Sequence, residues 1–258
     1  MRFQTKNGVL IAQANGETLR IEPWGKDSLR VRATMLPEFS GKDWALTEVP
    51  EKTEAKAEQF EVDHLEIDGS MGKRTSASIT NGKIRAVVNF AGVITFYKEE
   101  QEILREYHRC YDGTISKESR CLKTVNREWK GVIGGSEYSL NLKFESNDGE
   151  KIFGMGQYQQ KYMDLKGCTL ELAQRNSQIS VPFAVSSLGY GMLWNNPAVG
   201  QVTFGKNYTE WTARSTKQMD YWITAGDTPD EIEQAYGRAV GTTPMMPEYG
   251  LGFWQCKL

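Results

Sequence analysis

The residues best suited to chemistry form one polar cluster, Gln174-Arg175-Asn176-Ser177-Gln178, directly before an apolar run, 179–185, that is typical of a buried strand. Amide and guanidinium groups donate several hydrogen bonds from a plane, and an amide also accepts them. Groups of this kind suit recognition of sugar hydroxyls. The same side chains could equally satisfy the backbone of their own loop. The cluster therefore predicts either a carbohydrate contact or a self-bonded loop.

Other chemistries find little support in the sequence. The two histidines, His64 and His108, have no Gly-x-Ser-x-Gly elbow beside them, which argues against Ser-His-Asp catalysis. No metal site is expected, because no CxxC pair accompanies them. The stretch Gly154-Met155-Gly156-Gln157 lacks the third glycine and the following helix of a dinucleotide-binding loop. We interpret this stretch as a structural turn, and no cofactor is predicted.

Composition narrows the class of protein. The formal net charge of −2 argues against a nucleic-acid partner, which would call for a basic excess. No apolar run approaches the ~18 residues of a membrane span, and residues 1–8 do not resemble a signal peptide. Four irregularly spaced cysteines are predicted to be free thiols in a reducing, cytoplasmic compartment. They are Cys110, Cys121, Cys168 and Cys256.

Short β-strands must position the polar cluster. The segments 9–14 and 18–24 alternate apolar and polar residues around Asn15-Gly16, a pair typical of a tight hairpin turn. The next strand, 29–34, places Arg30 and Arg32 on its polar face. Further strands are predicted at 77–80, with Asn81-Gly82 as a turn, and at 84–90, 93–97, 138–144, 151–153, 180–185, 190–194, 200–204, 208–213 and 218–224. Residues 35–60 and 108–136 are predicted as connections, and Trp194-Asn195-Asn196-Pro197 as a turn closing a hairpin. The spacing predicts an all-β fold, an antiparallel β-sandwich.

One helix is predicted from Pro229 to Val240. The hydroxyl of Thr228 can accept from the backbone N–H of Glu231, and the Glu231 side chain can reach back. Proline suits the first helical position, and Gly241 suits the position just after a helix.

The chain continues with a proline-rich connector at 242–249 and an apolar segment from Gly250 that is predicted to be a strand. Because natural domains rarely stop inside such a strand, we expect the chain to be a fragment. The expected division is a β-sandwich at 1–241 and, at 242–258, the connector with the start of a further domain.

Four segments in this order resemble glycoside hydrolase family 31, the family of α-glucosidases and α-xylosidases. The similarity covers residues 144–258, with a looser fit of the N-terminal hairpins, and the stretch ELAQRNS resembles the α-xylosidase branch. The segments are FGMGQYQQ (153–160), Arg175-Asn176 before SVPFAVSSLGYGMLWNNP (180–197), DYWITAGDTPDEI (220–232) and PMMPEYGLGFWQ (244–255).

The resemblance implies a sandwich like that of galactose mutarotase, followed by the first strand of a truncated (β/α)8 barrel. It also implies exo-acting, retaining hydrolysis of α-linked terminal sugars by two barrel aspartates. A barrel needs ~250 residues. Only 17 residues (258 − 241) follow Gly241. No catalytic residue is therefore expected in this chain, which alone should be inactive.

The resemblance also suggests site residues. In the family, a loop of the N-terminal domain extends over the barrel mouth, and an Arg-Asp pair in it helps to bind sugar. Arg175-Asn176 takes the matching place, with Asn for the usual Asp, so any contact that needs a carboxylate is in doubt. Asn176 is the predicted substrate contact, Arg175 is expected to hold the loop by binding carbonyls, and Gln174 is the third candidate. The predicted partner is an oligosaccharide or α-glycoside, and a homo-oligomeric parent stays open.

A free-standing carbohydrate-binding or mutarotase-like protein is the alternative. A mutarotase would need a His/Glu acid–base pair in a cleft, and His64 and His108 are poor candidates. A free-standing module would also expose a half-finished strand with Phe253 and Trp254, which favours aggregation.

Overall fold

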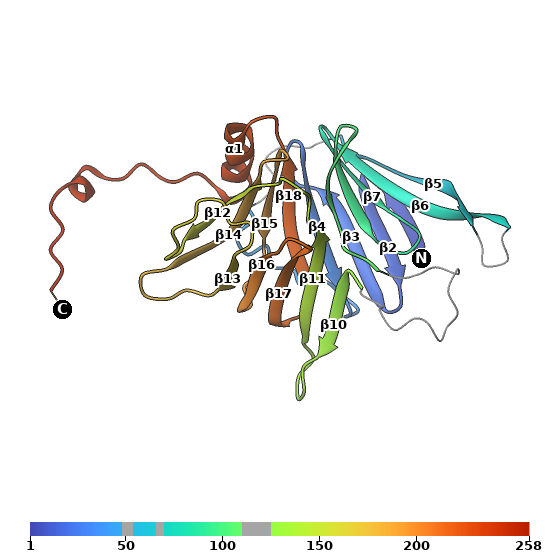
Figure 1. Ribbon diagram of the computed structural model, residues 1–258, viewed down its shortest axis with the longest axis horizontal. Coiled ribbons are helices and arrows are strands. Elements are labelled where there is room, and N and C mark those ends of the chain that lie inside the picture. Colours follow the sequence, from blue (N-terminus) through green and yellow to red (C-terminus); the bar gives the residue numbers. More distant parts are fainter. Residues whose placement is uncertain (48–53, 66–69, 110–124, 258) are drawn as a thin grey trace.

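The computed structural model describes residues 1–47, 54–65, 70–109 and 125–257, which fold into a β-sandwich of three sheets (Figure 1). The large sheet has the strand order β1 (Arg2–Lys6), β2 (Val9–Ala14), β3 (Glu17–Pro23), β4 (Ser28–Thr34), β18 (Met219–Ala225), β15 (Tyr190–Trp194), β14 (Ile179–Ser186) and β12 (Ile152–Gln157). The β11 sheet has the order β10 (Arg127–Gly131), β11 (Tyr138–Glu145), β17 (Tyr208–Thr216), β16 (Gly200–Phe204) and β13 (Thr169–Leu172). The β7 sheet has the order β5 (Lys56–Leu65), β6 (Met71–Asn81), β7 (Ile84–Val88), β8 (Ile94–Lys98) and β9 (Gln101–Arg105). Neighbouring strands pair antiparallel throughout the described residues, as predicted.

Aromatic side chains join the three sheets in one hydrophobic core. Trp194 of β15 stacks on Trp211 of β17, with ring centroids 5.7 Å apart. Tyr221 of β18 meets Phe96 of β8 and Phe144 of β11 edge to face, at 6.3 and 6.0 Å. Such edge contacts are favoured by the ring quadrupoles. The large sheet is therefore held against both smaller sheets by the same interior.

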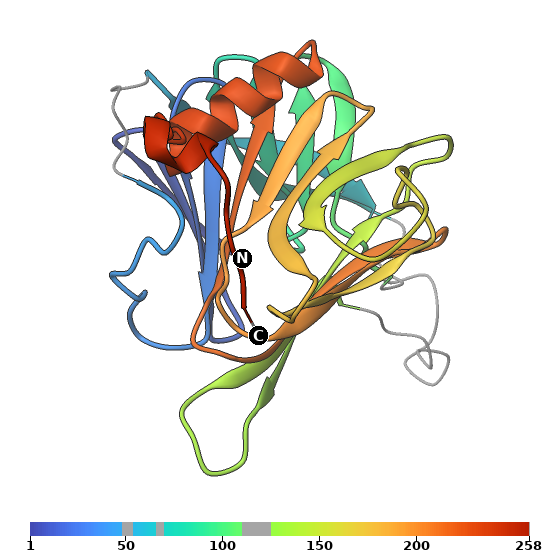
Figure 2. The ribbon, with the colours of Figure 1, turned by 90° about the vertical axis from the view of Figure 1, so that its left-hand side faces the viewer.

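The predicted helix is confirmed as α1 (Pro229–Val240). The Thr228 hydroxyl accepts from the Glu231 N–H at 3.2 Å, and Gly241 follows the helix with φ 93°. The Glu231 carboxylate accepts from the N–H of Asp227. The helix lies against the outer face of the large sheet, at β15 and β18 (Figure 2). Its buried residues join a second apolar cluster, which contains Leu46, Phe183, Val185, Leu193, Trp222, Ile232, Ala235 and Ala239.

The predicted hairpin turns are correct at one Asn-Gly pair and displaced at the other. Asn15 (φ 52°) and Gly16 (φ 82°) form the two-residue turn between β2 and β3. At the second pair, Asn81 is the last residue of β6, and the loop is Gly82-Lys83. The Asn81 amide stays in the strand because it donates to the carbonyls of Gly25 and Ser28, at 2.8 and 2.7 Å.

Two segments predicted as connections contain strands. β5 begins at Lys56, inside the predicted connection 35–60, and β10 lies inside the predicted connection 108–136. Each of these strands is fixed by hydrogen bonding along a neighbour, β6 or β11, which a local pattern does not show. Of the predicted free thiols, Cys168 and Cys256 are free, while Cys110 and Cys121 lie outside the described residues.

The strand predicted from Gly250 onward does not form. Residues Glu248–Leu251 make a short 3-10 helix, η2, and residues 252–257 have no regular structure. A strand needs a partner for its backbone groups, and this segment projects away from the sandwich (Figure 1). Within the described part of the chain, no helix has the length and apolar character that a membrane crossing requires.

The glycines at 154 and 156 lie inside a strand rather than in the predicted turn. Gly154, Met155 and Gly156 have φ of 96°, 70° and 89°, and the pairing of β12 with β14 shifts register between the two glycines. A bulge of this kind requires residues that tolerate positive φ. A Cβ on Gly156 would lie 2.4 Å from the carbonyl oxygen of Ile179.

We therefore expect Gly156→Ala to lower the free energy of unfolding by about 2–3 kcal/mol. The matched control is Gly25→Ala, because Gly25 has φ 87° and nothing within 4 Å of its would-be Cβ. This control should cost about 1 kcal/mol, from the backbone conformation alone. Chemical denaturation measures both values, and equal losses would show that the β14 backbone does not restrict position 156.

Candidate functional site

The predicted sugar-binding residues lie in the loop that joins β13 of the β11 sheet to β14 of the large sheet. Arg175 and Gln178 form an isolated antiparallel bridge, closed by Asn176 and Ser177. Ser177 has φ 66°, which completes the tight turn. Asn176 therefore stands at the exposed tip of the loop, and no hydrogen bond from its amide to another described residue is present.

Gln174 is engaged by the loop itself. Its amide nitrogen donates to the carbonyl of Ser180 at 2.9 Å, and its amide oxygen accepts from the Ser180 N–H at 3.2 Å. Gln178 donates in the same way to the carbonyl of Ala173 at 2.9 Å. Both side-chain amides thus make the hydrogen bonds to the loop backbone that a neighbouring strand would otherwise make. The Asn176 amide makes no such bond and is therefore free to meet a ligand.

Arg175 has a carboxylate partner in place of the expected carbonyls. Its guanidinium pairs with Glu171 on β13, and Arg214 lies 3.7 Å from the other oxygen of that carboxylate. Glu171 precedes Arg175 by four residues, so a carboxylate lies within reach of the guanidinium. The Arg175 side chain is 59% exposed, so part of the guanidinium can also reach a ligand.

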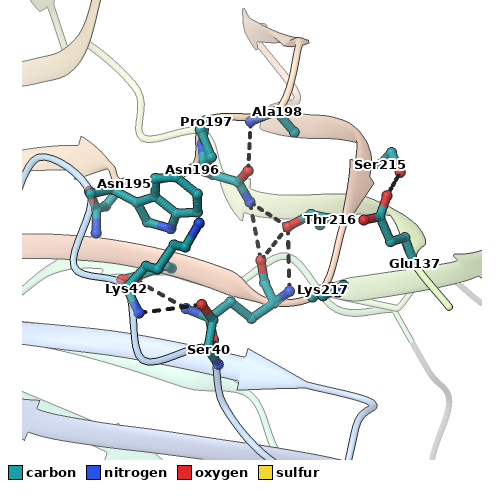
Figure 3. A pocket seen from close by; sticks show the side chains of 13 residues that line it. Ser40, Lys42, Glu137, Asn195, Asn196, Pro197, Ala198, Ser215, Thr216 and Lys217 are labelled. Carbon is teal, nitrogen blue, oxygen red and sulfur yellow. Dashed lines mark hydrogen bonds between the residues drawn. The ribbon is translucent and has the colours of Figure 1, made fainter.

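One cavity borders this loop, and a second cavity shares a wall with the first. The first cavity, of about 370 Å³, is bounded by the loop at Gln174 and by β15. The second, of about 360 Å³, is shown in Figure 3. Residues Asn196, Pro197 and Ala198 line both. The local sequence predicts only a turn here, and the signal that marks the shared wall is the pair of amides after Trp194.

The shared wall is rigid because the Asn196 side chain bonds on both sides. Its amide nitrogen donates to the Thr216 hydroxyl at 3.2 Å and to the Gln218 carbonyl at 3.1 Å (Figure 3). Its oxygen accepts from the Ala198 N–H at 3.0 Å. The amide therefore fixes the turn and keeps the two cavities apart.

The second cavity is lined in part by Asp220, which belongs to a buried ion pair with Arg30. The Arg30 guanidinium contacts both oxygens of Asp220, at 3.0 and 2.6 Å, and Asp43 at 2.6 Å. Burial lowers the pKa of Arg30, but its bonds to the two carboxylates outweigh burial and raise it, so the cation persists. Burial raises the pKa of Asp220, and Arg30 opposes that rise. Because Asp220 is committed to Arg30, it is unsuited to act as a nucleophile.

Other groups stand apart from these cavities. Neither His64 nor His108 lines either one, and His64 packs on Phe90 with centroids 4.6 Å apart. Within the described ranges, no three side chains of His, Cys, Asp or Glu converge as metal ligands would.

Known proteins resemble this chain over nearly its whole length. No protein-family model matches it. It is 48% identical over 251 residues to an uncharacterized family 31 glucosidase of Pseudescherichia vulneris, covering 94% of this chain and 45% of that protein. It is 29% identical over 267 residues to alpha-xylosidase A of Aspergillus niger, covering 99% of this chain and 35% of that protein.

The comparison with solved structures points to the same family as these two relatives. The crystal structure of a family 31 alpha-xylosidase from a soil metagenome, complexed with xylose, superposes with a TM-score of 0.87 at 48% identity. The superposition covers 99% of this chain and 37% of that one. The chain thus spans less than half the length of these relatives. By sequence and by fold, the chain belongs to glycoside hydrolase family 31 and matches the N-terminal β-sandwich region of its enzymes.

Proposed function

We propose that this chain is the N-terminal part of a retaining, exo-acting α-glycosidase that hydrolyses terminal α-xylosyl or α-glucosyl residues. The observation that carries the proposal is the 48% identity over 94% of the chain to a family 31 relative more than twice as long. In this proposal the sandwich is scaffold and substrate edge, while hydrolysis belongs to a barrel that follows it.

The exposed C-terminal segment supports a division at Gly241. Residues 242–257 expose six large apolar side chains, which soluble surfaces rarely present together. They are Met245, Met246, Tyr249, Leu251, Phe253 and Trp254. We propose that residues 1–241 form the sandwich domain and that 242–258 begin the barrel, which would cover these side chains. A cytoplasmic location also stays a prediction, supported by the free thiols Cys168 and Cys256.

Activity measurements on two chain lengths test the division of labour. We expect p-nitrophenyl α-D-xyloside or α-D-glucoside to be hydrolysed by a chain extended through the barrel in the source reading frame. The 258-residue chain should show no hydrolysis. Proton NMR of the first product should show the α-anomer, since retention passes through a glycosyl-enzyme intermediate. Hydrolysis by the short chain would refute the proposal.

The role of Asn176 is tested in the extended enzyme. Asn176→Ala should lower kcat/KM for the aryl glycoside about 3- to 10-fold, the effect of losing one or two neutral hydrogen bonds to a sugar hydroxyl. Asn207→Ala is the matched control. Asn207 is also exposed, but it follows the end of β16 that lies beside the start of β13, whereas Asn176 follows the other end of β13. Its loss should leave kcat/KM unchanged. An unchanged kcat/KM in Asn176→Ala would remove this residue from the site.

A further inference from the structure

The second cavity contains an aromatic side chain that the proposed catalytic role does not use. Trp44 lines this cavity and is 48% exposed, although it follows Asp43, which binds the buried Arg30. Its φ is 55°, in the left-handed region that bulky residues rarely enter. Strained backbone of this kind persists only where the surroundings impose it, and it is often found at ligand sites.

The surroundings of Trp44 do impose it. The buried amide of Asn195 donates to the Asp43 carbonyl at 3.0 Å and accepts from the Ala45 N–H at 3.1 Å, so it holds the residues on both sides of Trp44. Arg30 holds the Asp43 side chain from below. The indole is therefore presented by a preorganised loop rather than by a mobile one, which reduces the entropy lost on binding.

Polar groups line the rest of the cavity wall. Ser40, Lys42, Glu137 and Ser215 line the same cavity, where the Ser215 hydroxyl donates to the Glu137 carboxylate (Figure 3). The Lys42 ammonium lies 5.2 Å from the Trp44 ring centroid and has no carboxylate partner within the described residues. A cavity of about 360 Å³ with one aromatic face and a few convergent hydrogen-bonding groups has the size and composition of a small-ligand site.

We propose that this cavity binds one or two sugar rings of a neutral oligosaccharide, with the apolar face of a ring stacked on Trp44 and its hydroxyls bonded to the polar wall. The site is distinct from the predicted contact at Asn176, because Asn176 does not line this cavity. The choice of oligosaccharide as ligand rests on the proposed function. The site itself rests on the geometry around Trp44.

Tryptophan-resolved NMR of the 258-residue chain tests the proposal without any measurement of hydrolysis. The seven tryptophans are labelled with 5-fluorotryptophan, and Trp44→Phe identifies the resonance of Trp44. Maltotriose, and methyl α-D-xyloside as a single-ring comparison, should shift that resonance in a saturable way with a Kd on the order of 1 mM. Binding in a chain whose extended form fails to hydrolyse glycosides would separate this site from the proposed enzyme.

Variants locate the contact. Trp44→Ala should weaken binding of maltotriose roughly tenfold, measured by saturation-transfer difference NMR, whereas Trp44→Phe should retain most of the affinity because it keeps an aromatic face. Trp254→Ala is the matched control, since Trp254 is 75% exposed but lies in the C-terminal segment, outside the cavity. A circular dichroism melt confirms that each variant folds. No shift with about 10 mM of either sugar, unchanged affinity in Trp44→Ala, or an equal loss in Trp254→Ala would overturn the proposal.

Discussion

Replacing Arg127 with methionine should lower the free energy of unfolding by about 3–5 kcal/mol, because it leaves a buried carboxylate without its cation. Arg127 is buried and donates to both oxygens of Glu106 at 2.6 Å and to Glu17 at 2.8 Å. Glu106 has no exposed surface. Methionine keeps most of the apolar stem of the arginine, so the loss reports the charge rather than the packing.

The control for this prediction is Arg85→Met. Arg85 pairs with Glu100 at 3.4 Å, where the Glu100 side chain is 95% exposed. A pair of this kind contributes little in water, so the control should change stability by at most about 0.5 kcal/mol. Urea denaturation at a common pH measures the free energy of unfolding of both variants. Similar losses would show that burial does not determine how much the Arg127 ion pairs contribute to stability.

The Arg127 variant should also depend on pH in a defined direction. Burial raises the pKa of Glu106 above its ordinary value of 4.5, and Arg127 opposes that rise. Without Arg127 the folded-state pKa rises further, so above the unfolded value the folded state binds more protons than the unfolded state. Stability then falls as pH rises through this window. The variant should therefore be less destabilised at pH 5 than at pH 8, and the opposite trend would contradict the assigned role of Glu106.

Asp220→Ala should lower the free energy of unfolding by about 3 kcal/mol, because Arg30 would keep only the half-exposed Asp43 as a charged partner. Arg30 and Asp220 are each 1% exposed, on the outer faces of β4 and β18. Asp220 also lines the second cavity. We therefore expect weaker binding of maltotriose in this variant as well.

A double variant separates the ion pair from the packing around it. Arg30→Met with Asp220→Leu fills the site with apolar side chains and leaves neither charge behind. It should be more stable than Asp220→Ala by about 1–2 kcal/mol, since replacing a whole buried pair costs less than orphaning one member. Urea denaturation midpoints compare the double variant with Asp220→Ala. A double variant less stable than Asp220→Ala would show that the ion pair itself stabilises the fold.

The sequence alone determined the elements that depend on local chemistry. The helix was predictable from Thr228, Pro229 and Gly241, since a cap, a first-turn proline and a closing glycine act within one turn of chain. The alternation around 29–34 likewise predicted two faces for β4, and the order of family-like segments predicted the sandwich and its family. The helix and the strand were predictable because the interactions that decide them lie within a few residues of the chain. The sandwich and the family were predictable because the sequence is similar to known proteins.

The tertiary structure decided which polar residues are surface and which are core. The alternation placed Arg30 on a polar face, yet that face is covered by the 40–47 loop, and Arg30 is buried on Asp220, 190 residues away along the chain. The strand β10 depends in the same way on its register against β11.

The second cavity, beside Asn196, is formed by four separated segments, around 40–44, 137, 195–198 and 215–220. No local pattern in any one of them shows a cavity, because its walls exist only once the strands are paired. A sequence fixes hydrogen bonds between near neighbours, whereas burial, and the pKa shifts and binding surfaces that follow from it, depend on which distant segments the fold brings together.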